Sequence, residues 1–423
     1  MLVYKAALDL SYWFVVPEAG YYALSWNFNV AKLVESYVLA LGVQTLMPRS
    51  GKRLSHRVMW LLVVLSYVPM LTVFALADGP RMFVYGVTGF WLLVLFMSSL
   101  IPAPRLPRVK QSQAKVIYIS LYICMAIVSL FVIYEYLGFA AVFDLAKAYD
   151  IRSEFVQAGL PLKGYYFHWM ANVLNPIFLV ICIANKRWLL SIAIILLQLF
   201  IASSVGLRSY YFVLPFALGV VWVLTRKNSL WALGVISSVV VILELVLFVL
   251  ARSILEYTPL LSVEKLFLVP VHARALFVPA QLSFYYYDFF SLSGPIPFVY
   301  HFKYFFKVFE FREYSYAASP ANLVGAEYFG KPELAAVTGI VGDAYMNVGF
   351  LGLVLWAMVL VVLLKLVDGC SKGVDLRIGI AAIAMPSLSM SSTYLIRAVV
   401  TGGLLLSVVM LFLLRSRRDS YNV

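Results

Sequence analysis

The chain has few charged residues, and very few cysteines and histidines, for its length. Of its 423 residues 13% are charged and 63% are hydrophobic, while three are cysteine and four are histidine. A water-soluble domain of this size cannot bury so much apolar surface, so a soluble class is excluded. Cys124, Cys182 and Cys370 match neither metal-ligand spacing nor a disulfide framework, and we interpret them as small buried hydrophobic residues.

Several motifs are also missing. No glycine-rich phosphate loop ending in lysine follows a strand pattern, which argues against ATP-driven work. No Asp-x-Asp pair occurs in the first long polar loop, which argues against a metal-dependent lipid-sugar glycosyltransferase. The N-terminal stretch lacks an apolar core followed by a small-residue cleavage site, so we expect no cleavable signal peptide.

What the chain does contain is a series of apolar runs, each long enough to cross a membrane. They lie at 30–47, 58–77, 82–101, 115–136, 164–185, 188–205, 209–225, 229–250, 346–366, 377–393 and 397–414. Residues 9–26 form either a twelfth span or an interfacial segment, because Pro17 and Glu18 interrupt them. The sequence predicts an all-α polytopic transmembrane bundle of about eleven or twelve spans, forming one membrane domain over residues 1–423.

The positive charge follows this periodicity. Basic junctions such as "RSGKRLSHR" and "RLPRVKQSQAK" alternate with junctions that are acidic, mixed or nearly uncharged. By the positive-inside rule the basic junctions and the C-terminus face the cytoplasm. The net charge of +13 therefore indicates topology and attraction to anionic lipids; we expect no nucleic-acid partner.

Two segments on the predicted outer side are long, 137–163 and 251–345. The second is dense in tyrosine and phenylalanine, as in "QLSFYYYDFF", a composition that suits either the headgroup zone or stacking on sugar rings. Within it, 261–282 has two prolines and predicts an interfacial or re-entrant helix pair. We expect the functional site on this side.

Ionisable groups at membrane depth are costly, so each is a candidate functional residue. Arg208 opens the seventh span at the outer face, where a snorkelling arginine is the competing interpretation. Arg274 lies inside an apolar segment. Arg252 and Arg397 favour interface anchoring, with Arg252 close enough to the outer loop to contribute. Converging arginines would clamp a lipid diphosphate without metal, since the guanidinium fork matches its oxygens.

Two groups are candidates for acid–base chemistry. His272 lies two residues before Arg274, although a hydrogen-bonded interfacial histidine has the same signature. Asp343 lies in "GDAYMNVGFLGLVL" (342–355), where it precedes Tyr345 and Asn347 at the start of an apolar run. A carboxylate in the first turn of a helix is also a good cap, so both roles stay open.

Four segments together resemble the bacterial oligosaccharide repeat-unit polymerases, the Wzy family. "GIVGDAYMNVGFLGLVLWAMVL" is similar to the family's acidic, tyrosine, asparagine and glycine hallmark near the C-terminal third. "AYDIRSEF" followed by "YYFHWMANVLNPIFLV" resembles its first outer loop and Asn-Pro span. "SSVGLRSYYFVLPF" and "RALFVPAQLSFYYYDFF" resemble its basic turn and its arginine-proline-tyrosine segment. The resemblance covers most of residues 140–370; the first 140 residues add only spans.

The resemblance implies a metal-independent and cofactor-free glycosyltransferase of the membrane-embedded C type, with a large outer loop. Such enzymes lie in the bacterial inner membrane and transfer a growing glycan from its polyprenyl diphosphate onto the next lipid-linked unit. It implies undecaprenyl-diphosphate-linked oligosaccharides as donor and acceptor. Membrane lipids, a chain-length regulator and a flippase are the further partners we expect.

The resemblance also assigns residues. Arg208 and Arg274 take the diphosphate clamp, with Arg252 nearby, and Asp343 or His272 takes acid–base or acceptor-orienting work. The remaining candidates bind substrate or shape the site: Tyr149, Asp150, Arg152, Tyr287, Tyr345 and Asn347. The sequence has Asp343 where glutamate is frequent in the family and Val348 where phenylalanine is. These differences bear on sugar specificity more than on the class.

We expect the polar first turn of the helix near Asp343 to face an outward cavity, with Gly349 and Gly352 allowing another helix to approach. An O-antigen ligase is the main alternative, but "HFKYF" (301–305) has lysine where that family's histidine motif needs asparagine or serine. A flippase or transporter should show broken helices in two related halves, and no internal repeat is evident.

Overall fold

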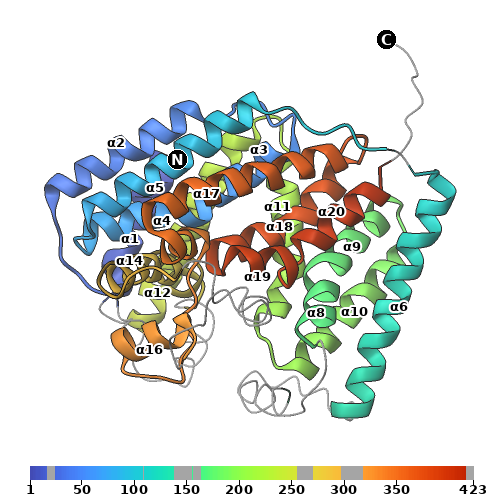
Figure 1. The fold of residues 1–423 in the computed structure, drawn as a ribbon. Coiled ribbons are helices and arrows are strands. Elements are labelled where there is room, and N and C mark those ends of the chain that lie inside the picture. The colour runs from blue at the N-terminus through green and yellow to red at the C-terminus, as the bar shows by residue number, and fades with distance from the viewer. Residues whose placement is uncertain are drawn as a thin grey trace, which may run out of the picture.

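The chain folds as an all-α bundle (Figure 1). The computed structural model describes residues 1–16, 24–107, 109–137, 155, 163–254, 270–296 and 318–415. Within these residues there is no β-strand, only an isolated bridge between Asn27 and Ala77. Eight of the described helices are long and apolar enough to cross a membrane. The predicted fold class, a polytopic helical membrane protein, is confirmed.

Every predicted span is mostly helical where the structure describes it, although the last, 397–414, is divided between two helices by residues 401–403. The first half contains α1 (Leu2–Val15), α2 (Val30–Leu46), α3 (Leu54–Leu62), η3 (Val63–Tyr67), α4 (Val68–Leu76), α5 (Arg81–Leu100), α6 (Gln111–Leu137), α8 (Lys163–Trp169), η4 (Met170–Leu174), α9 (Asn175–Ala184) and α10 (Trp188–Val205). The second half contains α11 (Ser209–Leu224), α12 (Ser229–Ile254), η5 (Pro270–Phe277), α14 (Val278–Ser293), α16 (Pro320–Phe329), α17 (Ile340–Cys370), α18 (Leu376–Ser392), α19 (Leu395–Val400) and α20 (Leu404–Leu413). The η elements are π-helical turns.

Burial separates the centre of the bundle from its edge. The span formed by α3, η3 and α4 is 89% buried, whereas that of α6 is 17% buried. Figure 1 shows α6 at one edge of the bundle, where its apolar side chains face outward. The exposed cysteine is Cys124 on α6, so our expectation that all three cysteines are buried is wrong for it. It lies on a surface where lipid replaces protein as the apolar neighbour.

The N-terminal helix α1 begins at Leu2, seven residues before the segment that the sequence suggested. Tyr4, Leu8 and Tyr12 are buried at helical spacing, and α1 packs against α12 and α4. One face therefore lies in the bundle, which favours a packed helix over an interfacial one. Residues 17–23 lie outside the described part of the chain.

Each π-helical turn ends two residues before a proline in the first turn of the following α-helix, and the three prolines are Pro69, Pro176 and Pro279. Proline has no backbone N–H to donate. In η3, Val68 N–H bonds back five residues to Val63 O, so the next such bond would run from Pro69 to Val64 O. The Tyr4 hydroxyl donates to Val64 O instead, at 3.2 Å. Helix α1 thus supplies the donor that proline lacks.

The residues predicted to form an interfacial or re-entrant helix pair are described only from 270 onward. There η5 and α14 form one continuous helix from Pro270 to Ser293 that passes through Pro279. Residues 270–282 therefore belong to one helix that continues to Ser293, and Pro279 does not end it. The rest of the predicted pair lies outside the described residues.

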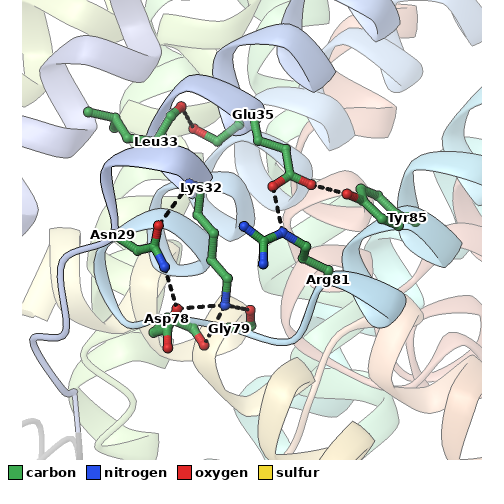
Figure 2. Close-up of polar contacts among 9 residues, drawn as sticks. Asn29, Lys32, Leu33, Glu35, Asp78, Gly79, Arg81 and Tyr85 are labelled. Atoms are coloured by element: carbon green, nitrogen blue, oxygen red, sulfur yellow. Dashed lines mark hydrogen bonds and ion pairs between the residues drawn. The ribbon is translucent and has the colours of Figure 1, made fainter.

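A charged network ties the start of α2 to the turn between α4 and α5 (Figure 2). Lys32 Nζ pairs with Asp78 Oδ1 at 2.6 Å and donates to Gly79 O at 2.6 Å. Arg81 Nε donates to Glu35 Oε2 at 2.9 Å. The hydrogen bond from Lys32 lowers the pKa of the Asp78 carboxyl below its ordinary value. These alternating charges therefore join α2, α4 and α5 at one end of the bundle.

Candidate functional site

The Asp343 carboxylate is fully buried near the start of α17. Its Oδ2 accepts hydrogen bonds from the Leu395 backbone N–H at 2.8 Å and from Trp356 Nε1 at 3.0 Å. Its Oδ1 accepts from Asn347 Nδ2 at 3.1 Å. Asp343 thus caps the N-terminus of α19, a helix other than its own.

A break inside α17 makes this geometry possible. Asp343 and Trp356 would lie about 20 Å apart along a straight helix, yet their side chains are hydrogen-bonded. The backbone leaves the helix at Val348 and Gly349, where Gly349 has φ 61° and ψ −140°. Such a conformation is essentially restricted to glycine, so Gly349 sets the direction of the second half of α17.

We expected Gly349 and Gly352 to allow a neighbouring helix to approach α17, but the structure shows a different role for them. No side chain or backbone atom approaches the Cβ position of Gly349 within 4 Å, whereas a Cβ at Gly352 would collide with the Ala344 carbonyl oxygen. The close approach is therefore between the two halves of α17 and involves no second element. The expectation that these glycines admit a neighbouring helix is wrong, because the break folds the chain back on itself.

Tyr345 and Tyr287, both predicted to bind substrate, lie in one aromatic cluster. Their ring centroids are 4.9 Å apart, and both rings contact Phe83. Tyr345 is 8% exposed and shares a hydrogen bond of 3.0 Å with Ser291. This packing joins α14 to α17 and α5, and it leaves Tyr287 the more accessible of the two tyrosines.

Helix α19 is held at both ends by the segments on which the family resemblance rests. At its N-cap the Tyr394 hydroxyl meets the Tyr286 hydroxyl of α14 at 2.6 Å. At its C-terminal end Val400 O accepts from Trp169 Nε1 of α8 at 2.8 Å. We call Tyr394–Val400, with the side chains that hold it, the α19 junction. Figure 1 shows α19 between α14 and α17 on one side and α8 and α9 on the other.

A histidine–tyrosine pair connects the segment "SSVGLRSYYFVLPF" to the α19 junction. His168 Nδ1 and the Tyr210 hydroxyl are 2.6 Å apart, joining α8 to the first turn of α11. Arg208, half-buried, is the N-cap residue of α11, two positions before Tyr210. Arg397, exposed on α19, lies close enough to His168 to interact with it electrostatically. Arg208 therefore lies at the start of α11, two residues from the His168–Tyr210 pair, and Arg397 lies on α19.

Of the remaining predicted residues, the structure describes the side chain of Arg274 alone, and it lies on an element that does not pack against α11. Arg274 is exposed on η5, an element that packs against α1, α4, η3 and α14, whereas α11 packs against α9, α10, α12 and α18. The side chains of His272 and Arg252, on η5 and α12, fall outside the described part of the chain. Three further candidates also lie wholly outside it: Tyr149, Asp150 and Arg152.

Sequence reasoning missed an ion pair in α1 whose lysine is buried. Lys5 Nζ bonds to both oxygens of Asp9 at 2.7 and 2.8 Å, and Lys5 is fully buried. The Tyr37 hydroxyl and Thr72 Oγ1 also donate to Asp9, at 2.9 and 2.8 Å. Lysine and aspartate four residues apart in an apolar helix were the signal.

No metal site is evident in the described part of the chain, because no group of three histidine, cysteine or acidic side chains is arranged to hold an ion there. No protein-family model matches the chain, and no characterised protein or solved structure matches it either. The fold and the α19 junction therefore define a polytopic helical membrane protein with a polar site held by four distant segments.

Proposed function

We propose that this protein polymerises polyprenyl-diphosphate-linked oligosaccharide repeat units at the outer face of a bacterial inner membrane. The observation that carries the proposal is the α19 junction. The four segments that resemble the polymerase family lie far apart in sequence, yet all four contact α19 or its neighbour His168. These four segments were selected only because they resemble the family. If the chain shares the family's function, the four segments should also share a site.

The chemistry needs positive charge on a departing diphosphate. The acceptor hydroxyl of one lipid-linked unit attacks the anomeric carbon of the growing glycan. The bond from that carbon to the diphosphate oxygen breaks, and the hydroxyl proton is lost to a base. In our proposal Arg397 and Arg208 stabilise the diphosphate, because guanidinium donors stabilise the charge that develops on phosphate oxygens. Arg274 remains a candidate for the same role.

Asp343 has a different role in this proposal. Its carboxylate oxygens already accept three hydrogen bonds in a fully buried environment, so we assign it to positioning. By holding the N-terminus of α19 it fixes where Arg397 stands. A different group, one that reaches the substrate, must then take the proton from the acceptor hydroxyl. His272 is the candidate that the sequence offers for this role.

The first test is the glycan made by a deletion strain, displayed as a ladder on a gel. Loss of a polymerase leaves a single repeat unit on the final acceptor, whereas loss of a ligase leaves polymer on the carrier lipid. Complementation with Arg208→Lys, Arg274→Lys or Arg397→Lys tests the clamp, since lysine keeps the charge but lacks the fork. Arg377→Lys is the matched control, because Arg377 pairs with Asp375 in the predicted cytoplasmic turn. Normal ladders in all three variants would reject the clamp.

A second candidate is a lipid-linked sugar transporter, which the break in α17 favours, since discontinuous helices build many transporter sites. Transporters of that kind carry such breaks in two related halves. Among the described helices α17 is the one with non-helical backbone angles inside it. Accumulation of unflipped lipid-linked units on the cytoplasmic side of the deletion strain would select the transporter.

A further inference from the structure

A buried, incompletely bonded guanidinium lies at the opposite end of the bundle from the α19 junction. Arg57 on α3 is 5% exposed, and its Nε donates to Leu224 O at 3.2 Å. Its Nη1 is buried and has no hydrogen-bond partner, and no described carboxylate forms an ion pair with Arg57. A buried charge without a counter-charge is costly, which points to a missing anion.

Two basic turns meet at this guanidinium. A Cβ on Gly51 would lie 3.0 Å from Arg57 Nη2, so the 47–53 turn lies against one side of it. Leu224 is the last residue of α11, and the 225–228 turn follows it directly. Neither turn contains an acidic residue, and the exposed cations on them are Arg49, Lys52, Arg53, Arg226 and Lys227.

Side chains of α3 hold the 47–53 turn in place. His56 Nδ1 lies 2.6 Å from Ser50 O, and Trp60 Nε1 donates to Pro48 O at 3.0 Å. The acid on the neighbouring helix, Asp368, accepts from both the backbone N–H and the hydroxyl of Ser55. It caps α3 and supplies one negative charge, whereas the two turns carry five exposed cations, so the basic cluster keeps an excess of positive charge.

The helices that lead into the two turns present apolar groups to lipid. Trp222 is 54% exposed in the last turn of α11, and the Arg226 guanidinium lies 4.3 Å from its ring centroid. Leu46, the last residue of α2, is 60% exposed. An anion that carries acyl chains fits this border better than a free anion, since its tail would cover these side chains.

We propose that Arg57 and the turns 47–53 and 225–228 form a binding site for the phosphate of an anionic phospholipid. The phosphate supplies the negative charge that Arg57 lacks, and the exposed cations of both turns surround the headgroup. The Nε bond to Leu224 O also offsets the negative end of the α11 dipole, which would otherwise repel a phosphate. Basic sites between spanning helices on the cytoplasmic side suit such headgroups.

The test uses the full chain purified in neutral detergent and titrated with phosphatidylglycerol, phosphatidylcholine or inorganic phosphate. Bound lipid is counted by native mass spectrometry, and thermal unfolding reports stabilisation. We expect phosphatidylglycerol to bind and stabilise. Arg226→Gln should weaken the apparent affinity about five-fold, the effect of one cation near an anionic headgroup. Arg57→Gln should weaken it about ten-fold or more, as a group that bonds the phosphate directly.

Two further variants keep the proposal open to refutation if Arg57→Gln folds poorly. Arg57→Lys keeps the charge and should recover part of the affinity. Arg377→Gln removes a cation in the neighbouring turn that already pairs with Asp375, and it should bind phosphatidylglycerol like the wild type. Equal affinity in every variant, or equal stabilisation by inorganic phosphate, would overturn the lipid site.

Discussion

Replacing Asp343 distinguishes a carboxylate that positions α19 from one that takes a proton. Alanine removes the carboxylate acceptor of three buried donors and strands those of Leu395 and Trp356, while Asn347 Nδ2 keeps its bond to the backbone oxygen of residue 343. Each stranded donor costs about 1–3 kcal/mol. Because the two stranded donors share one group and relax together, we expect Asp343→Ala to lower the free energy of unfolding by about 2–6 kcal/mol.

Asparagine is the milder change. Its single oxygen can still accept from Leu395 and Trp356, which both use one oxygen of Asp343. Its amide nitrogen then faces the Nδ2 donor of Asn347, so one bond is lost and two are weakened from charged to neutral. We expect Asp343→Asn to cost about 1–3 kcal/mol and to leave part of the polymerising activity.

The assay combines unfolding of the purified variants in mixed micelles with the glycan ladder in cells, at matched protein level. If Asp343 holds α19, activity should fall in proportion to stability across the two variants. An asparagine variant as stable as the wild type but without polymer would refute positioning and make Asp343 the base. An alanine variant of unchanged stability would refute the capping geometry itself.

Three further predictions concern the bundle. In an otherwise cysteine-free chain, a cysteine at Ser112 should resist a membrane-impermeant reagent in intact cells while cysteines within 137–163 react, and the reverse would invert the topology. Lys5→Met should lower the unfolding free energy by about 3–5 kcal/mol, because Asp9 is left without a counter-charge in a largely buried position and keeps only the neutral donors Tyr37 and Thr72; the double variant Lys5→Met, Asp9→Leu should be more stable than Lys5→Met alone. Gly349→Ala should cost about 1–3 kcal/mol from backbone strain, and a melting temperature equal to the wild type would show that the break is not needed.

The spans were predictable because the length of an apolar run is a local property. Predicted spans such as 188–205 and 209–225 match α10 and α11 to within a residue. The break in α17 was not predictable in the same way. Gly349 signals that a positive φ is allowed, but the fold-back depends on the contact between Asp343 and Trp356, which only the tertiary structure shows.

The role of α19 was missed for a related reason. "YLIRAVV" reads as the first turns of the last span, and Arg397 then looks like an interface anchor. In the structure these residues form a separate helix whose N-terminus depends on Asp343, 52 positions away in sequence. Hydrophobic periodicity carries no information on such a partner. By contrast, Lys5 and Asp9 could have been found, since charges four residues apart in an apolar segment are a local signal.

The π-helical turns have a consequence for how this chain tolerates insertions and deletions. A π turn holds one residue more than the α turn it replaces, so the helix that follows keeps the rotational phase it would have without the extra residue. Deleting one residue within Val63–Tyr67 would therefore restore a regular helix and leave α4 facing the same way, whereas deleting one residue from the regular part of α3 would rotate α4 by about 100°. After such a deletion in α3, Thr72 would turn away from Asp9, and the hydrogen bond that links α4 to α1 would be lost. A one-residue deletion should therefore be tolerated better within a π turn than in the regular helix beside it, although in both cases the apolar run would still be long enough to cross the membrane.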